Sequence, residues 1–318
     1  MKCAKKYISA GVILTLSLAL SLPARSNDKL KLVTTIPDLA DIAARIGGDR
    51  VEVEALAKGY QDPHFVDAKP SLILKLKRAD MFIQVGLDLE IGWVPPLLEA
   101  ARNKNIFYGG TGYVNASEGI ELLEVPNVDA AQLRAQGDIH VWGNPHFWLD
   151  PMNGKIIAGN ISAKLSKISP SDASYFQNNL ATFTAQLDSA NAVWMQKIAP
   201  FKNTEILAYH NSWPYFEEHF QLRIAGFIEA KPGIPPTPGH LVDLIQIIKN
   251  KKIGVIIIST YFDDKPAKSV ASQVGAKVIP VAPSVGAFKE VKSYFDLFSY
   301  NIDVLVKAFE ETEVAPIH

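Results

Sequence analysis

Residues 169–198 read SPSDASYFQNNLATFTAQLDSANAVWMQKI, and this stretch decides how the chain is organised. Its opening, Ser169-Pro170-Ser171-Asp172, is typical of a helix N-terminus, and no glycine or further proline follows up to Ile198. At 1.5 Å per residue, the predicted helix is up to about 40 Å long. Strand and helix patterns lie on both sides of it, so we interpret it as a stiff linker between two lobes. Two helices packed within one lobe are the alternative.

Both flanking regions alternate short strands with helices, which is typical of parallel sheets with right-handed crossovers. The continuously apolar strand 255–258 also indicates a sheet that is covered on both faces. The predicted fold class is therefore α/β, with two lobes that each contain a mostly parallel sheet flanked by helices, joined by one long linker helix. Strands are predicted at 30–35, 51–56, 81–85, 206–209, 224–228, 255–258 and 277–281, and helices at 37–46 and 70–79, after Pro214, at 237–249, through Val270 and from about Lys289.

Residues 1–26 have the order of a secretory signal peptide: a basic start, an apolar run at 7–22 and then Ala24-Arg25-Ser26. The run is shorter than the ~20 residues of a usual spanning helix. The single cysteine, Cys3, precedes the run, where it cannot be the lipidated cysteine of a lipoprotein signal. We expect a cleaved signal peptide and a periplasmic protein, with an uncleaved anchor as the alternative. The predicted division is signal peptide 1–26, N-terminal lobe 27–168, linker helix 169–200 and C-terminal lobe 201–318.

Composition excludes several functions. Removal of residues 1–26 changes the formal net charge from −1 to −5, which argues against a nucleic-acid partner, since such a partner needs a basic stripe. The remaining chain has no cysteine, so an exported protein must rely on its hydrophobic core rather than on disulfides. The sequence contains neither a phosphate-binding loop, nor a Gly-x-Ser-x-Gly elbow, nor a His-Glu-x-x-His pair, so ATP hydrolysis and these hydrolase chemistries are not predicted.

Three histidines, His64, His146 and His210, each occupy a short polar or turn-forming stretch. The first two repeat the pattern Pro-His-Phe, and His210 directly follows the strand predicted at 206–209. Because proline restricts its own φ and the residue before it, each Pro-His-Phe presents its imidazole from a stiff turn. Three rigidly directed imidazoles are ligands that zinc prefers. Since open α/β sheets bind ligands at strand-to-loop junctions, we predict that these side chains meet in the cleft between the lobes.

Other polar residues lie close to these motifs in sequence. Asp62 and Asp67 flank His64, and either they orient a ligand as hydrogen-bond acceptors or they cap the local turn. His140 precedes His146 by six residues, and it is either an accessory metal-binding residue or a surface histidine.

Three segments carry a resemblance to a known family. They are residues 59–67 (GYQDPHFVD), 144–151 (NPHFWLDP) and 232–238 (PGIPPTP). In this order they resemble the metal-binding solute-binding proteins of bacterial zinc, manganese and iron ABC importers, the zinc-uptake and adhesin-like family with two lobes joined by one long helix. The resemblance extends over essentially the whole chain after residue 26. It implies that His64, His146 and His210 are the metal ligands.

The function that the resemblance implies is that of an exported receptor rather than an enzyme. Such a receptor, usually a monomer, captures a divalent transition metal between its lobes and delivers it to a membrane ABC permease. Segment 232–238 is either a rigid cap over a lobe or part of a face for the permease. Three imidazoles favour zinc, whereas manganese prefers more carboxylate oxygens. A manganese or iron receptor of the same type is the first alternative.

One position departs from the family pattern. The family usually supplies a carboxylate ligand from a turn after the last strand, but that turn here reads VAPSVG at 281–286 and has Ala282 at the expected position. Either water or another side chain therefore occupies the fourth position. Asp263 and Asp264 follow the strand 255–258, and we choose Asp263 as the candidate. Three protein ligands and water also form the layout of a catalytic zinc site, so a secreted zinc-dependent hydrolase is a further alternative, with an adhesin as the third.

Overall fold

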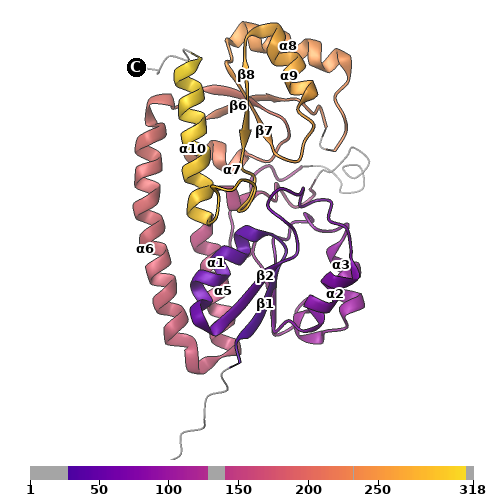
Figure 1. Ribbon diagram of the computed structural model, residues 1–318, viewed down its shortest axis with the longest axis vertical. Coiled ribbons are helices and arrows are strands. Elements are labelled where there is room, and N and C mark those ends of the chain that lie inside the picture. The colour runs from indigo at the N-terminus through magenta and orange to yellow at the C-terminus, as the bar shows by residue number, and fades with distance from the viewer. Residues whose placement is uncertain (1–27, 128–139, 232, 313–318) are drawn as a thin grey trace, which may run out of the picture.

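The computed structural model describes residues 28–127, 140–231 and 233–312, so the predicted signal peptide lies outside the described residues. Two four-stranded sheets are present, with strand orders β2-β1-β3-β4 and β6-β5-β7-β8, and every pair is parallel. This confirms the prediction of two parallel-sheet lobes (Figure 1). The strands are β1 (Leu30–Thr34), β2 (Val51–Ala55), β3 (Met81–Gln84), β4 (Tyr113–Asn115), β5 (Glu205–Ala208), β6 (Arg223–Phe227), β7 (Val255–Ser259) and β8 (Lys277–Val281).

Most helices begin with a proline in the first turn, where the missing amide costs nothing and the fixed φ suits a helix. This explains why the predicted starts after Pro37, Pro70 and Pro214 agree with the structure. The helices are α1 (Pro37–Gly47), α2 (Pro70–Lys77), α3 (Val94–Ala101), α5 (Asn153–Ile168), α6 (Ala173–Ile198), α7 (Pro214–Phe220), α8 (Pro238–Lys251), α9 (Lys265–Val274) and α10 (Tyr294–Glu311).

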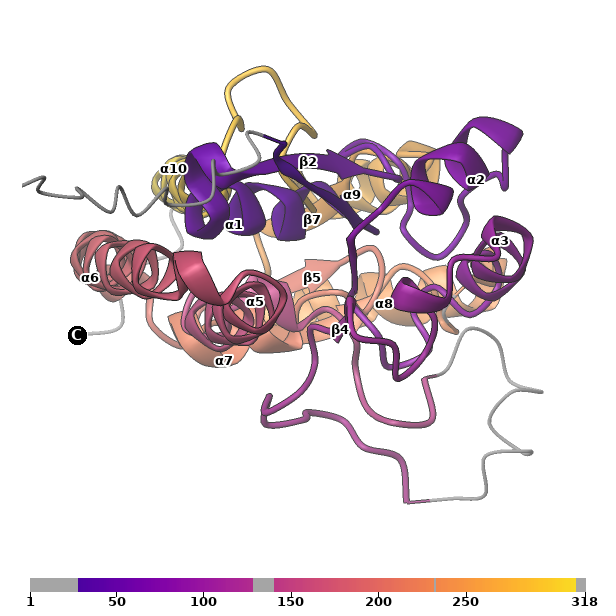
Figure 2. The ribbon, with the colours of Figure 1, turned by 90° about the horizontal axis from the view of Figure 1, so that it is seen from below.

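Helices cover both faces of each sheet, as Figure 2 shows from below for the first lobe. Along β1, Leu32 packs with α1 and α5, whereas the next residue, Val33, packs with α2 and α3. Along β7, Ile257 faces the core shared with α10, and Ile256 faces α8 and α9. Successive strand side chains point to opposite faces, so a sheet buried on both sides must be apolar throughout.

The long helix is present and runs beside both lobes (Figure 1). A short 3-10 turn at Pro170–Asp172 leads into α6, and α10 packs along α6 on the way back. Phe183 and Leu187 of α6 are buried, and Trp194 Nε1 donates to Ser299 Oγ of α10 at 3.0 Å. The linker helix is therefore packed against its neighbours and is not exposed to solvent on all sides. Among the described helices, none has both the length and the apolarity needed to cross a membrane.

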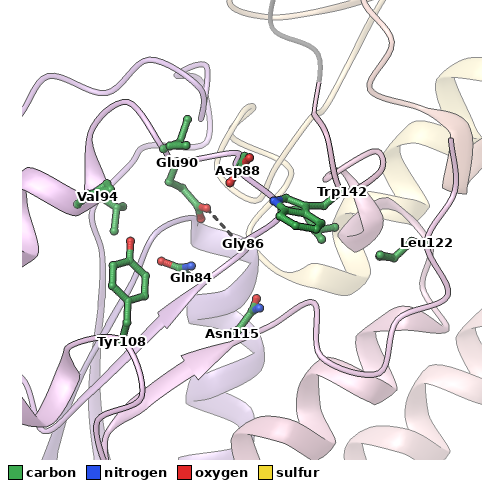
Figure 3. Close-up of a pocket in the computed structure, with 12 residues that line it drawn as sticks. Gln84, Gly86, Asp88, Glu90, Val94, Tyr108, Asn115, Leu122 and Trp142 are labelled. Carbon is green, nitrogen blue, oxygen red and sulfur yellow. Dashed lines mark hydrogen bonds between the residues drawn. The ribbon is translucent and has the colours of Figure 1, made fainter. Parts of the chain in front are cut away.

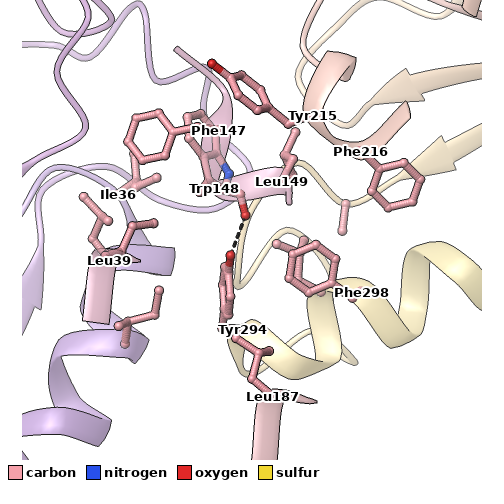
Figure 4. Close-up of a cluster of buried hydrophobic side chains, with 14 of the residues drawn as sticks. Ile36, Leu39, Phe147, Trp148, Leu149, Leu187, Tyr215, Phe216, Tyr294 and Phe298 are labelled. Atoms are coloured by element: carbon pink, nitrogen blue, oxygen red, sulfur yellow. Dashed lines mark hydrogen bonds between the residues drawn. The ribbon is translucent and has the colours of Figure 1, made fainter. Parts of the chain in front are cut away.

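A short 3-10 helix, η3 (Phe147–Leu149), joins the cores of the two lobes (Figure 4). Trp148 is 2% exposed and donates from Nε1 to the carbonyl of Pro283, at 3.1 Å, in the loop after β8. The hydroxyl of Tyr294 donates back to the Trp148 carbonyl at 2.7 Å. The segment that follows His146 therefore fixes the position of that histidine relative to both lobes.

A second contact between the lobes involves a buried acid. Asp38, in the first turn of α1, is fully buried and accepts hydrogen bonds from Ser284 Oγ and, at 3.0 Å, from the amide of Val285. The backbones approach closely beside it, because a Cβ on Gly59 would lie only 2.0 Å from the Val285 carbonyl oxygen. Burial raises the pKa of Asp38 to about 7, with a smaller contribution from Asp41, and the two hydrogen bonds oppose this rise.

We expect Asp38→Asn to reduce the pH dependence of stability. The folded protein binds the Asp38 proton more tightly than the unfolded chain does, because the ordinary pKa of this carboxyl is 3.8. The free energy of unfolding therefore falls as the pH rises from about 4 to about 7. This difference in the pKa of Asp38 corresponds to about 4 kcal/mol of unfolding free energy, and that stabilisation is fully lost above pH 7. Urea unfolding of both proteins between pH 4 and pH 8 measures it, with Asp49→Asn, an exposed position on the same lobe, as the control. Parallel profiles for wild type and Asp38→Asn would contradict the expectation.

Candidate metal centre

His64, His146 and His210 come together between the two sheets. One ring nitrogen of each lies within 4.8 Å of the others, and all three side chains are buried. His64 lies in the loop after β2, His146 directly before η3, and His210 two residues after the end of β5. Two histidines thus come from segments before the long helix and one from a segment after it, so the group exists only when both lobes are in place.

The repeated motif has a local geometry that holds the imidazole. In the first copy, Asp62 Oδ1 accepts both the amide of His64, at 3.0 Å, and its ring Nδ1, at 2.7 Å. In the second copy, Asn144 Oδ1 accepts the amide of His146, at 3.0 Å, and its Nδ1, at 2.9 Å. An Asp or Asn two residues before the histidine therefore fixes both the turn and the ring, and leaves Nε2 to face the centre. The role of Asn144 was not recognised from sequence, although Asn-Pro-His parallels Asp-Pro-His.

His210 is held by a residue from the neighbouring strand. Its Nδ1 lies 2.8 Å from Glu229 Oε2, and both side chains are buried. Because β5 and β6 are parallel neighbours, their carboxyl ends bring His210 and Glu229 side by side, and the Glu229 amide donates to the Tyr209 carbonyl at 2.9 Å. Glu229 was not predicted as a site residue from the sequence. The available signal was an acidic residue just after the strand next to the one that carries His210.

The electrostatics of the centre favour a cation. Burial, and then the nearby His64 and His210, lower the pKa of His146 well below its ordinary value. Burial would raise the pKa of Asp62, but the hydrogen bond and charge of His64 outweigh it and hold this pKa below its usual range. Nε2 of His146 is buried without a hydrogen-bond partner. A neutral imidazole with a free lone pair, near an ionised carboxylate, is the form that binds a metal.

A fourth histidine stands at the edge of the group. His140 Nε2 lies 3.1 Å from His64 Nε2, and the two rings stack with centroids 5.2 Å apart. Burial, followed by His64 and His210, lowers the pKa of His140 to about 3, and a hydrogen bond from its ring to the Leu87 carbonyl opposes this shift.

The acidic candidates lie elsewhere. Asp263 is exposed and accepts the amide of Lys265 at the start of α9, so it is not among the residues grouped around the three histidines. Asp67 is also exposed, and its carboxylate lies 3.9 Å from Lys69 Nζ. Ala282 is fully buried, and Asn301 clamps its backbone through hydrogen bonds of 2.7 and 2.8 Å.

We expect Glu229→Ala to weaken zinc binding by 10- to 100-fold, the usual loss when the hydrogen-bond acceptor of a metal-bound histidine is removed (roughly 1.4–2.7 kcal/mol). The His210 ring would lose its orientation, and the site would lose a buried negative charge. Glu229→Gln keeps an acceptor oxygen and should lose less. Competition against a zinc chelator measures both variants, with Glu218→Ala, at an exposed position on α7, as the control. Unchanged affinity in Glu229→Ala would contradict this role.

Two parallel-sheet lobes beside one long helix, with histidines from both lobes around one point, define a metal-binding solute-binding protein. The chain belongs to the family described as zinc-uptake complex component A, periplasmic, whose profile matches residues 32–308.

Curated relatives and solved structures agree with this family. The chain is 26% identical over 297 residues to the metal ABC transporter substrate-binding lipoprotein SloC of Streptococcus mutans, covering 90% of this chain and 92% of that protein. It is 25% identical over 294 residues to the manganese ABC transporter substrate-binding lipoprotein PsaA of Streptococcus pneumoniae, covering 90% and 91%. A crystal structure of ZnuA superposes with a TM-score of 0.72 at 25% identity, over 91% of this chain and all of that one. The Mn-bound periplasmic metal-binding protein of Candidatus Liberibacter asiaticus, at 21% identity, has the same fold, with a TM-score of 0.70 over 88% and 99% of the two chains.

Proposed function

We propose that this protein is the receptor of a zinc ABC importer, with His64, His146 and His210 as ligands of the transported ion. Membership of the zinc-uptake family supports a metal receptor that delivers its ion to an ABC permease. The observation that carries the choice of zinc is the donor set, which is three imidazole nitrogens within 4.8 Å of one another and no carboxylate among them. Zinc prefers nitrogen ligands, whereas manganese prefers oxygen.

We propose His140 as the fourth ligand, in preference to Asp263. The 3.1 Å separation of His140 Nε2 from His64 Nε2 is too short for two neutral acceptors without a shared proton or a shared ion, which supports His140 as a neighbour of the bound ion. Four imidazoles would complete the four-coordinate tetrahedral arrangement that closed zinc sites have. Asp263 would have to leave the Lys265 amide and turn inward.

The alternatives have less support. A zinc-dependent hydrolase needs an open fourth position with water and a general base, and in our proposal His140 fills that position. The family consists of substrate-binding proteins rather than enzymes. A manganese receptor remains the principal competitor, because PsaA of the streptococci is named as one.

The proposed location is the periplasm, and the proposed partner is a membrane permease that receives one receptor molecule at a time. The curated relatives are named as lipoproteins, which places them outside the cytoplasm. The only cysteine in the sequence is Cys3, which stands before the apolar run, whereas these relatives are named as lipoproteins.

The experiment that tests the function is a titration of the metal-free protein with zinc and with manganese, read by calorimetry. We expect one zinc ion per chain and a preference for zinc of at least 100-fold, about 2.7 kcal/mol. His140→Ala should lower zinc affinity by at least tenfold, and Asp263→Ala should not change it. The opposite order of these two variants would assign the fourth position to Asp263, and tighter manganese binding would exclude the zinc assignment.

A further inference from the structure

A turn with left-handed backbone follows β3, beside the candidate metal centre. Gly86, Leu87 and Asp88 have φ angles of 88°, 54° and 64°. Glycine adopts this region freely, but Leu87 and Asp88 carry a Cβ and do so only under strain. Consecutive strained residues persist where surrounding contacts hold them, and such strain gathers at functional sites.

The carboxylate of Glu90 holds this turn. Oε1 accepts the amide of Val85 at 2.7 Å, and Oε2 accepts the amide of Gly86 at 3.0 Å. Glu90 is only 3% exposed, and it lies with Asp88 in the wall of a pocket of about 530 Å³ (Figure 3). One buried acid thus binds two successive amides at the carboxyl end of β3, where the left-handed segment starts.

The turn lies beside the segment that carries His140. His140, whose Nε2 lies 3.1 Å from that of His64, stands two positions before Trp142. Trp142 lines the same pocket as Asp88 and Glu90, so the segment 140–142 lies against the turn (Figure 3). This segment has no helix or strand to orient its side chains, and the direction of His140 therefore depends on such contacts.

We propose that Glu90 is a positioning residue of the metal centre, which holds the left-handed turn against which segment 140–142 packs and so directs His140 toward the ion. This proposal rests on the proposed function, in which His140 is the fourth ligand. Glu90 does not touch the ion and acts only through His140. Without its carboxylate, the Gly86 amide loses its acceptor and the Val85 amide keeps only its 3.3 Å bond to Thr35 Oγ1. The turn then relaxes, and segment 140–142 loses the support that orients the His140 ring.

The test compares wild type, Glu90→Ala, His140→Ala and the double variant by zinc affinity and by the visible spectrum of bound Co²⁺. Four-coordinate Co²⁺ absorbs far more strongly than the five- or six-coordinate ion. We expect Glu90→Ala to lower zinc affinity about tenfold and to weaken the cobalt bands as His140→Ala does. The double variant should match His140→Ala alone. Glu90→Gln, which keeps one acceptor oxygen, should be intermediate, and Glu99→Gln, exposed on α3, should resemble wild type.

The outcomes separate the two proposals. A wild-type cobalt spectrum in Glu90→Ala, or independent losses that add in the double variant, would overturn the positioning role and leave His140 as a ligand. A wild-type spectrum in His140→Ala would reject the fourth ligand and the role of Glu90 with it, while tight zinc binding would still support the receptor. If circular dichroism shows that Glu90→Ala does not fold, Glu90→Gln and its double variant with His140→Ala carry the same expectations.

Discussion

His146→Ala should reduce zinc affinity more than 100-fold, which is more than about 2.7 kcal/mol. His146 is the deepest of the three histidines, at 1% exposed, and its Nε2 is buried with no hydrogen-bond partner among the described residues. Its ring is held by Asn144 and by the packed η3 helix that follows. A neighbouring side chain could therefore replace it only if η3, which connects the cores of the two lobes, moved. Competition against a zinc chelator measures the loss.

Thermal unfolding with zinc supplies a second readout. A ligand at 1,000 times its dissociation constant stabilises the folded state by about 4.1 kcal/mol, so zinc should raise the melting temperature of wild type far more than that of His146→Ala. His240→Ala is the matched control, because His240 Nε2 lies 2.9 Å from the Phe227 carbonyl near the start of α8 and belongs to no metal-binding group of the described residues. Equal zinc stabilisation of both variants would remove His146 from the site.

Trp148→Ala should lower the free energy of unfolding by about 3–5 kcal/mol, the range for a buried aromatic residue replaced by alanine. The indole is 2% exposed, it fills the core between α1 and α10, and its Nε1 bonds the Pro283 carbonyl of the other lobe. Its removal leaves a cavity where the lobes join and a buried carbonyl without a donor. Urea unfolding, followed by circular dichroism, measures the change.

Trp142→Ala provides the matched control for that experiment. Trp142 is the same residue type, lies six positions earlier and is 60% exposed, so its replacement should change stability by no more than about 0.5 kcal/mol. A loss of less than about 1 kcal/mol in Trp148→Ala would show that η3 does not join the two lobes as inferred from its contacts.

Much of the architecture was readable from local pattern. Apolar alternation, proline at helix starts and the uninterrupted stretch up to Ile198 predicted the parallel sheets and the long helix, since these features depend on neighbours in sequence. The predicted terminal helix began too early, at about Lys289 instead of Tyr294, because Ser293, and not an earlier residue, caps it by accepting the Asp296 amide.

By itself, the sequence determined the lobes, the linker and the three histidines in their Asp-Pro-His, Asn-Pro-His and strand-end contexts, because each is a local pattern within a few residues. Only the tertiary structure decided what surrounds those histidines. Glu229 meets His210 because β6 pairs with β5, and His140 meets His64 across 76 positions of sequence. Asp263, chosen as the nearest acid after a strand, accepts the amide of Lys265 in the first turn of α9. Nearness in sequence specifies the turn that presents a side chain, whereas the packing of distant segments specifies which partners that side chain finds.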